Sequence, residues 1–185
     1  AVLLAMKAGD EKVSAAVANG GKDQNGWQVG GLAGGDSAHF NGDWLNRAGL
    51  AKAGIYANDP AEAMYPATRK DSSGEALDCS KHNYTLTFPA GQLPPVNAFW
   101  SVTVYDSTTG RLHPNDDDRY HINNTTAVKN EDGTYTFRFK LECKDGDVNC
   151  VAVPAGPFDV VARYYLPKPE IMNGEWTMPR PVVYN

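Results

Sequence analysis

Residues 99–105 read Phe-Trp-Ser-Val-Thr-Val-Tyr, and residues 134–141 read Thr-Tyr-Thr-Phe-Arg-Phe-Lys-Leu. Both stretches alternate with a period of two, which is typical of strands that bury one face. The first stretch places Trp100, Val102 and Val104 on a common face. In the second, aromatic residues alternate with Thr, Arg and Lys. The two stretches therefore predict an antiparallel sheet with one side buried in an aromatic core.

Further β signals lie on both sides of these two stretches. Residues 84–88 also alternate, and Asp132-Gly133 is a two-residue turn that we expect to join two strands. Residues 158–166 predict a further strand, bounded by Gly156-Pro157 and Pro167. The proline-rich residues 178–181 must follow an edge or the surface. We therefore expect a mainly β fold, an antiparallel β-sandwich.

The first 42 residues have a different character. Residues 1–19 carry apolar side chains at loosely helical intervals and end at Gly20-Gly21, which predicts a short N-terminal helix. Eight glycines lie between positions 20 and 42, too many for a regular element, so we expect an extended arm. The expected organisation is a helix and glycine-rich arm over 1–42, followed by a β-sandwich domain over 43–185, in a single domain overall.

Two helix starts open the second part of the chain. Asp43 can cap a helix that runs to about Ile55. Asp59-Pro60-Ala61-Glu62 combines an N-cap residue, a proline suited to the first helical position and a capping-box partner. We therefore expect short helices ahead of the strands, and we assign both acidic residues of the second motif to capping.

Composition restricts the classes of partner. The chain has 185 residues, 42% hydrophobic and 21% charged, which suits one domain with a real core. Its formal net charge is −5 and its basic residues are scattered, so we expect no nucleic acid partner. No apolar run reaches the roughly 18 residues needed to span a bilayer. We expect a protein that does not span a membrane, although it could lie at the periphery of a membrane complex.

The cysteines and the start of the chain bear on the compartment. Cys143 and Cys150 bracket a polar loop with a turn at Gly146, so they could close a short disulfide; reduced thiols are the equal alternative. Cys79 is left over. The chain begins at Ala1 without Met, and removal of a targeting segment is one explanation. We favour an organellar (plastid) or a secreted or periplasmic location over the cytoplasm.

The densest group of potential metal ligands is His113, Asp116, Asp117, Asp118 and His121. A hard cation could use such carboxylates if the loop folded around it. The aspartates do not follow the alternating pattern of a calcium loop, and Pro114-Asn115 precedes them, so a solvated turn is the favoured interpretation. We expect no metal and no cofactor.

Catalytic signals are weak. Asp106 at a strand end and Arg119 nearby could orient each other and shift their pKa values, but most such pairs fix loops. Ser101 lies in mid-strand without the Gly-x-Ser-x-Gly elbow that exposes a nucleophile. We therefore assign no catalytic residue, and we keep Asp106, Arg119, His113, Asp116 and His121 as weak candidates for binding a ligand or an ion.

Many short elements, in order from Asn25 to Pro181, resemble the domain of unknown function 1214. The positions that carry the resemblance are Asn25-Gly26-Trp27, Leu45, Arg47-Ala48, Asn58 through Tyr65-Pro66, Gly74, Leu77, Tyr84–Phe88, Gly91–Pro95, Phe99–Ser101, Tyr105-Asp106, Arg119-Tyr120, Asp132-Gly133, Pro154–Phe158, Arg163, Tyr165, Pro167, Gly174 and Trp176. The resemblance implies a jelly-roll-like sandwich. It also implies a domain that usually follows another, the domain of unknown function 1254, and that stands alone here.

This chain departs from the family pattern at two places. It has Asn149-Cys150-Val151-Ala152 where the family tends to have Asn-Trp-Leu-Pro, and it has Cys79 where glycine is usual. If the segment that corresponds to residues 149–152 serves binding in relatives, the absence of its tryptophan here puts an inherited binding role in question.

Three functions are compatible with the sequence. The first, which we prefer, is a non-catalytic interaction module, an accessory subunit that docks on a larger protein assembly such as photosystem I in an algal plastid. The second is a secreted or periplasmic domain that binds or hydrolyses a carbohydrate or another small ligand. The third is a capsid-like, self-assembling structural protein, suggested by fold analogy alone.

Overall fold

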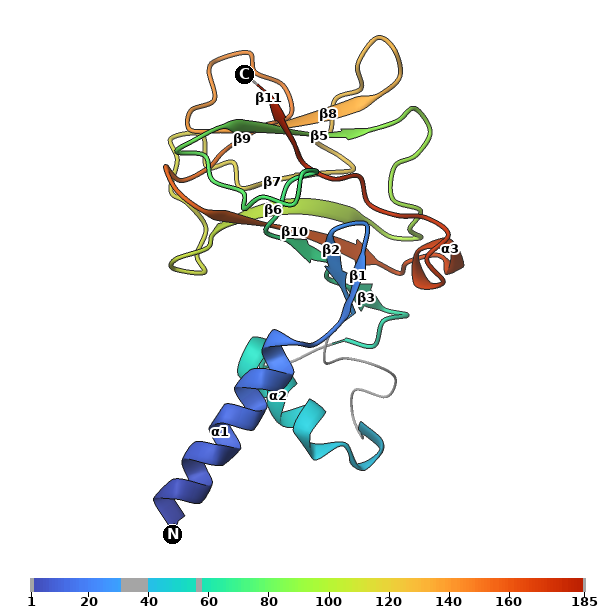
Figure 1. Cartoon of the computed structure of the whole chain (residues 1–185). Coiled ribbons are helices and arrows are strands. Elements are labelled where there is room, and N and C mark those ends of the chain that lie inside the picture. Colours follow the sequence, from blue (N-terminus) through green and yellow to red (C-terminus); the bar gives the residue numbers. More distant parts are fainter. Residues whose placement is uncertain (1, 31–39, 56–57, 185) are drawn as a thin grey trace.

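The computed structural model describes residues 2–30, 40–55 and 58–184 (Figure 1). The helical elements are α1 (Val2–Ala18), η1 (Phe40–Gly42), α2 (Trp44–Gly54) and α3 (Pro169–Met172). The strands are β1 (Lys22–Gln24), β2 (Trp27–Val29), β3 (Ala63–Met64), β4 (Ala67–Thr68), β5 (Asn83–Phe88), β6 (Trp100–Asp106), β7 (His121–Asn123), β8 (Tyr135–Lys140), β9 (Cys150–Ala152), β10 (Phe158–Tyr165) and β11 (Val182–Tyr184). The fold is mainly β, as expected.

The strands form two sheets. The larger has seven strands in the order β1-β2-β4-β10-β6-β7, with β3 also paired to β10. The smaller has the order β11-β5-β8-β9. Pairing is antiparallel except between β8 and β9, which run parallel. Within the described residues neither sheet closes into a barrel.

Side chains from both sheets meet in one aromatic core. Phe88 and Phe137 from the smaller sheet contact Trp100 from the larger, with ring centroids 6.0 and 5.9 Å away. Phe158 from β10 packs against Phe139 at 6.1 Å and Tyr84 at 5.5 Å. The alternation correctly predicted that Trp100, Val102 and Val104 of β6 and Phe137 and Phe139 of β8 enter this core. Burial is not confined to one side, however: Ser101 and Thr103 on the other side of β6 are also buried, and Leu141 is 49% exposed.

The glycine-rich segment contains regular structure that we did not expect. β1 and β2 form a tight hairpin around Asn25 and Gly26, whose φ angles of 54° and 78° suit a type I′ turn. Gln28 pairs with Ala67, which joins the hairpin to the larger sheet. The expectation of an irregular arm was therefore wrong for residues 22–29; its part over residues 31–39 lies outside the described residues.

Two helices near the N-terminus follow the sequence signals. The Asp43 carboxylate accepts a hydrogen bond from the backbone N–H of Asn46 at 2.9 Å and caps α2, as predicted. α1 continues through Gly9 without a break. The two helices pack against each other, and Lys52 of α2 donates to Asp10 and Ser14 of α1 at 2.6 and 2.7 Å. Figure 1 shows the helix pair projecting from one side of the sheets.

The second predicted helix start forms only one turn. The N–H groups of Glu62 and Ala63 both donate to the carbonyl of Asp59, at 2.8 and 3.0 Å, and the chain then enters β3. The capping motif therefore initiates a turn, but the next residues pair with β10 instead of continuing a helix. Tertiary pairing overrides the local helical signal here.

The turn at Asp132-Gly133 is present, but it does not join two paired strands. Asn130 and Thr134 close it through a backbone hydrogen bond of 2.8 Å. The preceding strand, β7, lies in the larger sheet, whereas β8 lies in the smaller. The turn thus lies between two strands, as expected, but these strands do not pair with each other, because an Asp-Gly signal marks a reversal of the chain without fixing the partner strand.

The C-terminal tail is held along the surface by a turn around Asp71. The backbone N–H of Ser72 donates to the carbonyl of Pro181 at 2.7 Å, and the Arg180 guanidinium donates to the carbonyl of Asp71. The buried Asp71 carboxylate accepts bonds from the N–H and hydroxyl of Ser73, at 2.8 and 2.6 Å. Burial alone would raise the pKa of Asp71, but hydrogen bonds from Ser73 and Glu75 lower it below its usual value.

The contact between the sheets can be tested at Phe137. We expect Phe137→Ala to lower the free energy of unfolding by ~3–5 kcal/mol, because the ring is fully buried and its removal leaves a cavity. Urea denaturation measures this change. Phe99→Ala is the matched control, since Phe99 is 44% exposed and its truncation should cost far less. Equal losses for both variants would contradict the assigned core.

The turn around Asp71 predicts a pH dependence of stability. A carboxyl whose pKa is lowered on folding stabilises the protein above its unfolded pKa of about 3.9, and this stabilisation is lost as the pH falls through the native pKa. We expect Asp71→Asn to lower stability by ~1–3 kcal/mol at neutral pH, and the difference from wild type to shrink in acid. Urea denaturation at several pH values checks this, with exposed Asp116→Asn as the control; a difference independent of pH would contradict it.

Candidate functional site

The outer face of the larger sheet carries the main polar network of the described residues. Along β10 the buried residues Phe158, Val160, Ala162 and Tyr164 alternate with less buried residues on the opposite face. The register pairs Asp159 with Tyr105, and β6 turns its own alternate residues to the same side. The period of two that builds the core thus also aligns charged and aromatic side chains outside it.

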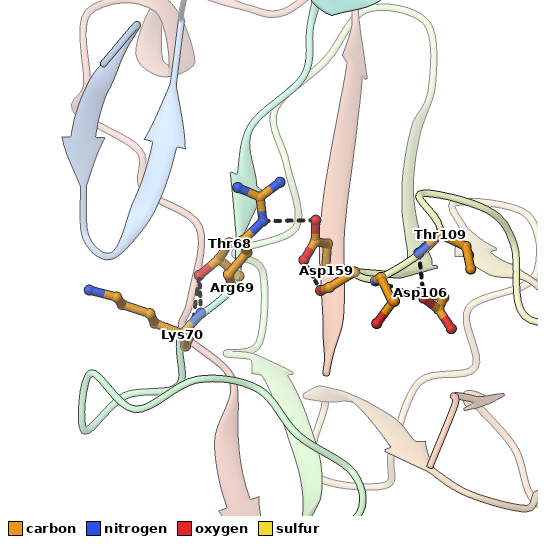
Figure 2. A network of polar contacts seen from close by, with 8 residues as sticks. Thr68, Arg69, Lys70, Asp106, Thr109 and Asp159 are labelled. Carbon is orange, nitrogen blue, oxygen red and sulfur yellow. Dashed lines mark hydrogen bonds and ion pairs between the residues drawn. The ribbon is translucent and has the colours of Figure 1, made fainter. Parts of the chain in front are cut away.

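Asp159 is the centre of one group on this face. Its carboxylate accepts from Arg69 Nε at 2.9 Å and from the hydroxyl of Ser107. Figure 2 shows Arg69 reaching across from the segment after β4 toward Asp159. Because the Arg69 side chain is 77% exposed, this ion pair contributes little to stability.

Arg163 forms a second group, held by hydroxyls. Its guanidinium donates to Thr103 Oγ1 at 2.8 Å and to the Tyr105 hydroxyl at 2.6 Å, and its Cζ lies 5.7 Å from the Tyr105 ring centroid. Tyr165, next but one along β10, stacks on Phe99 with centroids 4.2 Å apart, and its ring meets Tyr65 edge-on at 6.3 Å. The result is a fixed cation beside exposed aromatic rings.

Asp106 orders a turn. Its carboxylate accepts from the backbone N–H groups of Thr108 and Thr109, both at 2.8 Å, and Figure 2 shows the second of these bonds. The hydrogen bond from Thr109 is the main cause of a lowered pKa for Asp106, and the charge of His113 nearby acts in the same direction. Asp106 and His113 are therefore close, but the carboxylate is committed to capping the end of β6.

Arg119 lies elsewhere. Its guanidinium donates to the backbone carbonyls of Asp147 and Cys150, at 3.3 and 3.5 Å. None of the described ion pairs joins Arg119 to Asp106, so the structure does not bring these two candidates together. Arg119 instead braces the loop between the paired cysteines.

The histidine and aspartate candidates are dispersed. Asp116 is exposed in the turn after Asn115, and His121 is exposed at the start of β7. In the turn, Asn115 bonds the backbone N–H of Arg119 at 3.1 Å and Asp118 accepts from the Tyr120 hydroxyl at 2.9 Å. Across the described ranges no three His, Cys, Asp or Glu side chains are gathered in a way that could hold a metal ion.

Cys143 and Cys150 are joined by a disulfide, with Cα atoms 5.9 Å apart. It closes the loop between β8 and β9, and Lys140 and Asp147 form an ion pair of 2.5 Å across the same loop. Next to it, the buried Asn149 bonds both the N–H and the carbonyl of Val128 through its side chain, at 2.8 and 2.6 Å. Cys79 is buried and free, and burial raises the pKa of its thiol to about 11, so it is poorly reactive.

A sequence profile of the family described as "Protein of unknown function (DUF1214)" matches residues 62–169. The chain belongs to the DUF1214 family. That span includes strands β3 to β10 and every candidate side chain on the outer sheet face. No curated protein matches the chain significantly.

Two solved structures are similar to this DUF1214 chain. The VPA0106 protein from Vibrio parahaemolyticus is 28% identical with a TM-score of 0.73; the match covers 97% of this chain and 43% of that one. A putative uncharacterized protein from Burkholderia cenocepacia is 16% identical with a TM-score of 0.49, over 70% of this chain and 31% of that one. This DUF1214 chain therefore spans less than half the length of the Vibrio protein.

Sequence reasoning missed the two groups on the outer face. Asp159 and Arg163 alternate with the apolar residues of β10, so their outward position could have been found from the period of two. Their partners could not, because Arg69 and Tyr105 come from segments that only the register brings alongside β10. In this DUF1214 domain the alternation along β10 therefore indicated the polar side chains of the outer face better than the cluster of histidines and aspartates between His113 and His121 did.

The disulfide gives a direct test of how the Arg119 loop is held. We expect Cys143→Ser to lower the free energy of unfolding by ~2–3 kcal/mol, since the bridge closes a short loop. Denaturation with and without dithiothreitol measures this loss, which the reductant should reproduce in the wild-type protein. Cys79→Ser is the control that should keep its sensitivity to the reductant; a wild-type protein unaffected by reduction would contradict a structural bridge.

Proposed function

We propose that this DUF1214 domain is a non-catalytic interaction module, an accessory subunit that docks on a larger protein assembly through the α1–α2 helix pair. The observation that carries the proposal is that α1 has no buried residue although its first turns are apolar. A surface helix ordinarily turns its apolar residues toward the protein interior and its polar residues toward solvent, whereas the apolar first turns of α1 face solvent.

The exposed apolar surface of the pair is large. In α1, Val2, Leu3, Leu4 and Met6 are 66–81% exposed. In α2, Trp44 is 70% exposed. Since exposed apolar patches of this kind mark interaction sites, we infer that a protein partner with an apolar surface covers the helix pair. No described helix has both the length and the apolarity required to cross a bilayer.

A second argument comes from the sheets. Of the candidate residues, Asp106 caps a turn and Arg119 holds a loop. On the outer face the Ser107 hydroxyl donates to Asp159, a carboxylate that also pairs with Arg69, and none of the described hydrogen bonds joins a histidine to either residue. Side chains of the two sheets interdigitate in one core. We propose that the two layers form a jelly-roll-type sandwich that serves as a rigid base for the docking helices.

We propose an oxidising compartment, organellar or secreted, as the site of action. The Cys143–Cys150 disulfide supports this choice, because such bonds persist where thiols are not kept reduced. An algal plastid assembly such as photosystem I, the example named from the sequence, is the first partner that we propose to test.

The helix pair can be tested by native size. We expect the protein to sediment in a sucrose gradient of gently solubilised source extract with fixed companions, in a particle far larger than its own 20.0 kDa. A tagged variant with Leu3, Leu4 and Met6 changed to Ser should sediment as a free protein, since its apolar contacts are lost. Mass spectrometry of the particle identifies the companions.

The control variant changes Lys7, Glu11 and Lys12 of the same helix to Ser and should remain in the particle. Because α1 buries no residue, thermal unfolding of the sheets should be the same in both variants. A wild-type protein that sediments alone, or a Leu-Leu-Met variant that stays in the particle, would show that the helix pair is not the docking surface. Flotation with lipid vesicles in place of protein would also contradict the proposal.

A further inference from the structure

The outer face of the larger sheet holds a positive charge that none of the described acidic side chains pairs with. Arg163 is half-buried, and the described ion pairs do not include it. Its hydrogen-bond partners, Thr103 and Tyr105, are uncharged. The acidic residue of the same strand, Asp159, is occupied by Arg69 and Ser107. A partly desolvated guanidinium without a carboxylate is a binding position for an anion.

The guanidinium is also fixed in orientation and has donors to spare. Thr103 and Tyr105 use two of its five N–H groups, one on each terminal nitrogen. Its Nε makes none of the described hydrogen bonds and is not among the buried nitrogens that lack a partner. Nε is therefore not closed off from solvent, and a planar carboxylate could accept from it and from a neighbouring N–H group of the same guanidinium.

Aromatic rings lie beside this charge. Phe99 is 44% exposed and stacks on Tyr165. The pKa of Tyr165 is raised above its usual value, mainly by burial and also by Tyr65, and the charge of Arg163 opposes this increase in part. These groups are therefore contiguous. Tyr65 is 40% exposed, and its hydroxyl accepts from the Asn58 amide at 2.8 Å. The face thus offers ring surfaces with hydroxyl and amide groups at their edge.

We propose that this face, defined by Tyr65, Phe99, Tyr105, Arg163 and Tyr165, binds an acidic sugar of the uronate class. The carboxylate would bind Arg163, and the pyranose ring would lie against Phe99 with its hydroxyls toward Tyr65 and Asn58. An open sheet face suits an extended ligand better than a small compact one. The proposal is independent of the docking role of α1 and α2, which lie in another part of the chain.

The test is calorimetric titration of the full chain with tri-galacturonate and with neutral galactotriose. We expect saturable binding of the acidic sugar and binding of the neutral sugar at least ~10-fold weaker, a difference of about 1.4 kcal/mol. Arg163→Gln should lower the affinity for tri-galacturonate ~10-fold or more. The affinity of Arg163→Lys should lie between that of Arg163→Gln and wild type, since lysine keeps the charge but lacks the planar guanidinium that can donate two parallel hydrogen bonds to a carboxylate. Phe99→Ala should weaken binding ~5-fold or more, which is about 1 kcal/mol, the low end of the energies for a ring stacked on an aromatic side chain.

Arg138→Gln is the matched control, because Arg138 lies on the outward side of β8 in the smaller sheet; its affinity should stay within about twofold of wild type. A thermal unfolding scan of each variant separates lost binding from lost structure. No binding of tri-galacturonate at millimolar concentration would overturn the proposal. So would equal binding of galactotriose or benzoate, or an affinity that survives Arg163→Gln. If Arg163→Gln removes the protein from its large particle without affecting sugar binding, the face belongs to a protein interface instead.

Discussion

The contact of aromatic rings between the two sheets is the constraint on which the rest of this structure depends. The space between the sheets is filled by rings that contact one another: Trp100 from the larger sheet, and Phe88 and Phe137 from the smaller. Each strand must therefore keep its register to keep its ring buried. A slip of one residue would move the whole alternate set outward. The same register fixes the outer face, because it decides which side chains of β6 and β10 become neighbours.

The core, the outer face of the larger sheet and the exposed surface of the helix pair are therefore three separate parts of the molecule. The interior is mainly apolar, and among the described residues its one buried acidic side chain is Asp71, which orders a turn. Charged and aromatic groups with free binding capacity lie on the outer face of the larger sheet. The apolar surface of the helix pair lies apart from both and adds nothing to the core. Loss of either proposed binding surface should consequently leave the sheets folded, which separates function from stability.

The sequence predicts individual strands and helix starts, but it does not predict which strands pair. Alternation in β6, β8 and β10 predicts strands and their buried faces, and Asp43 predicts the start of α2, because both signals arise within a few residues. The parallel pairing of β8 with β9 leaves no such mark. Asp59-Pro60 and Asp132-Gly133 carry correct local chemistry, but their roles depend on partners far along the chain. Among the candidates on the outer face, Arg163 could be placed from its strand, whereas its pairing with Tyr105 required the register.

The hairpin of β1 and β2 has a consequence for how this chain can evolve. Asn25 and Trp27 donate side-chain hydrogen bonds to the carbonyls of Met178 and Pro179, at 2.8 and 2.9 Å, across more than 150 residues of sequence. Met178 is itself buried, with its sulfur 3.1 Å from the Tyr164 hydroxyl. Both acceptors are main-chain carbonyls, which remain whatever side chain stands at 178 or 179, so the constraint falls on the two donors. Loss of the Trp27 indole would leave the Pro179 carbonyl without this bond, so Trp27 should vary less among related sequences than Pro179.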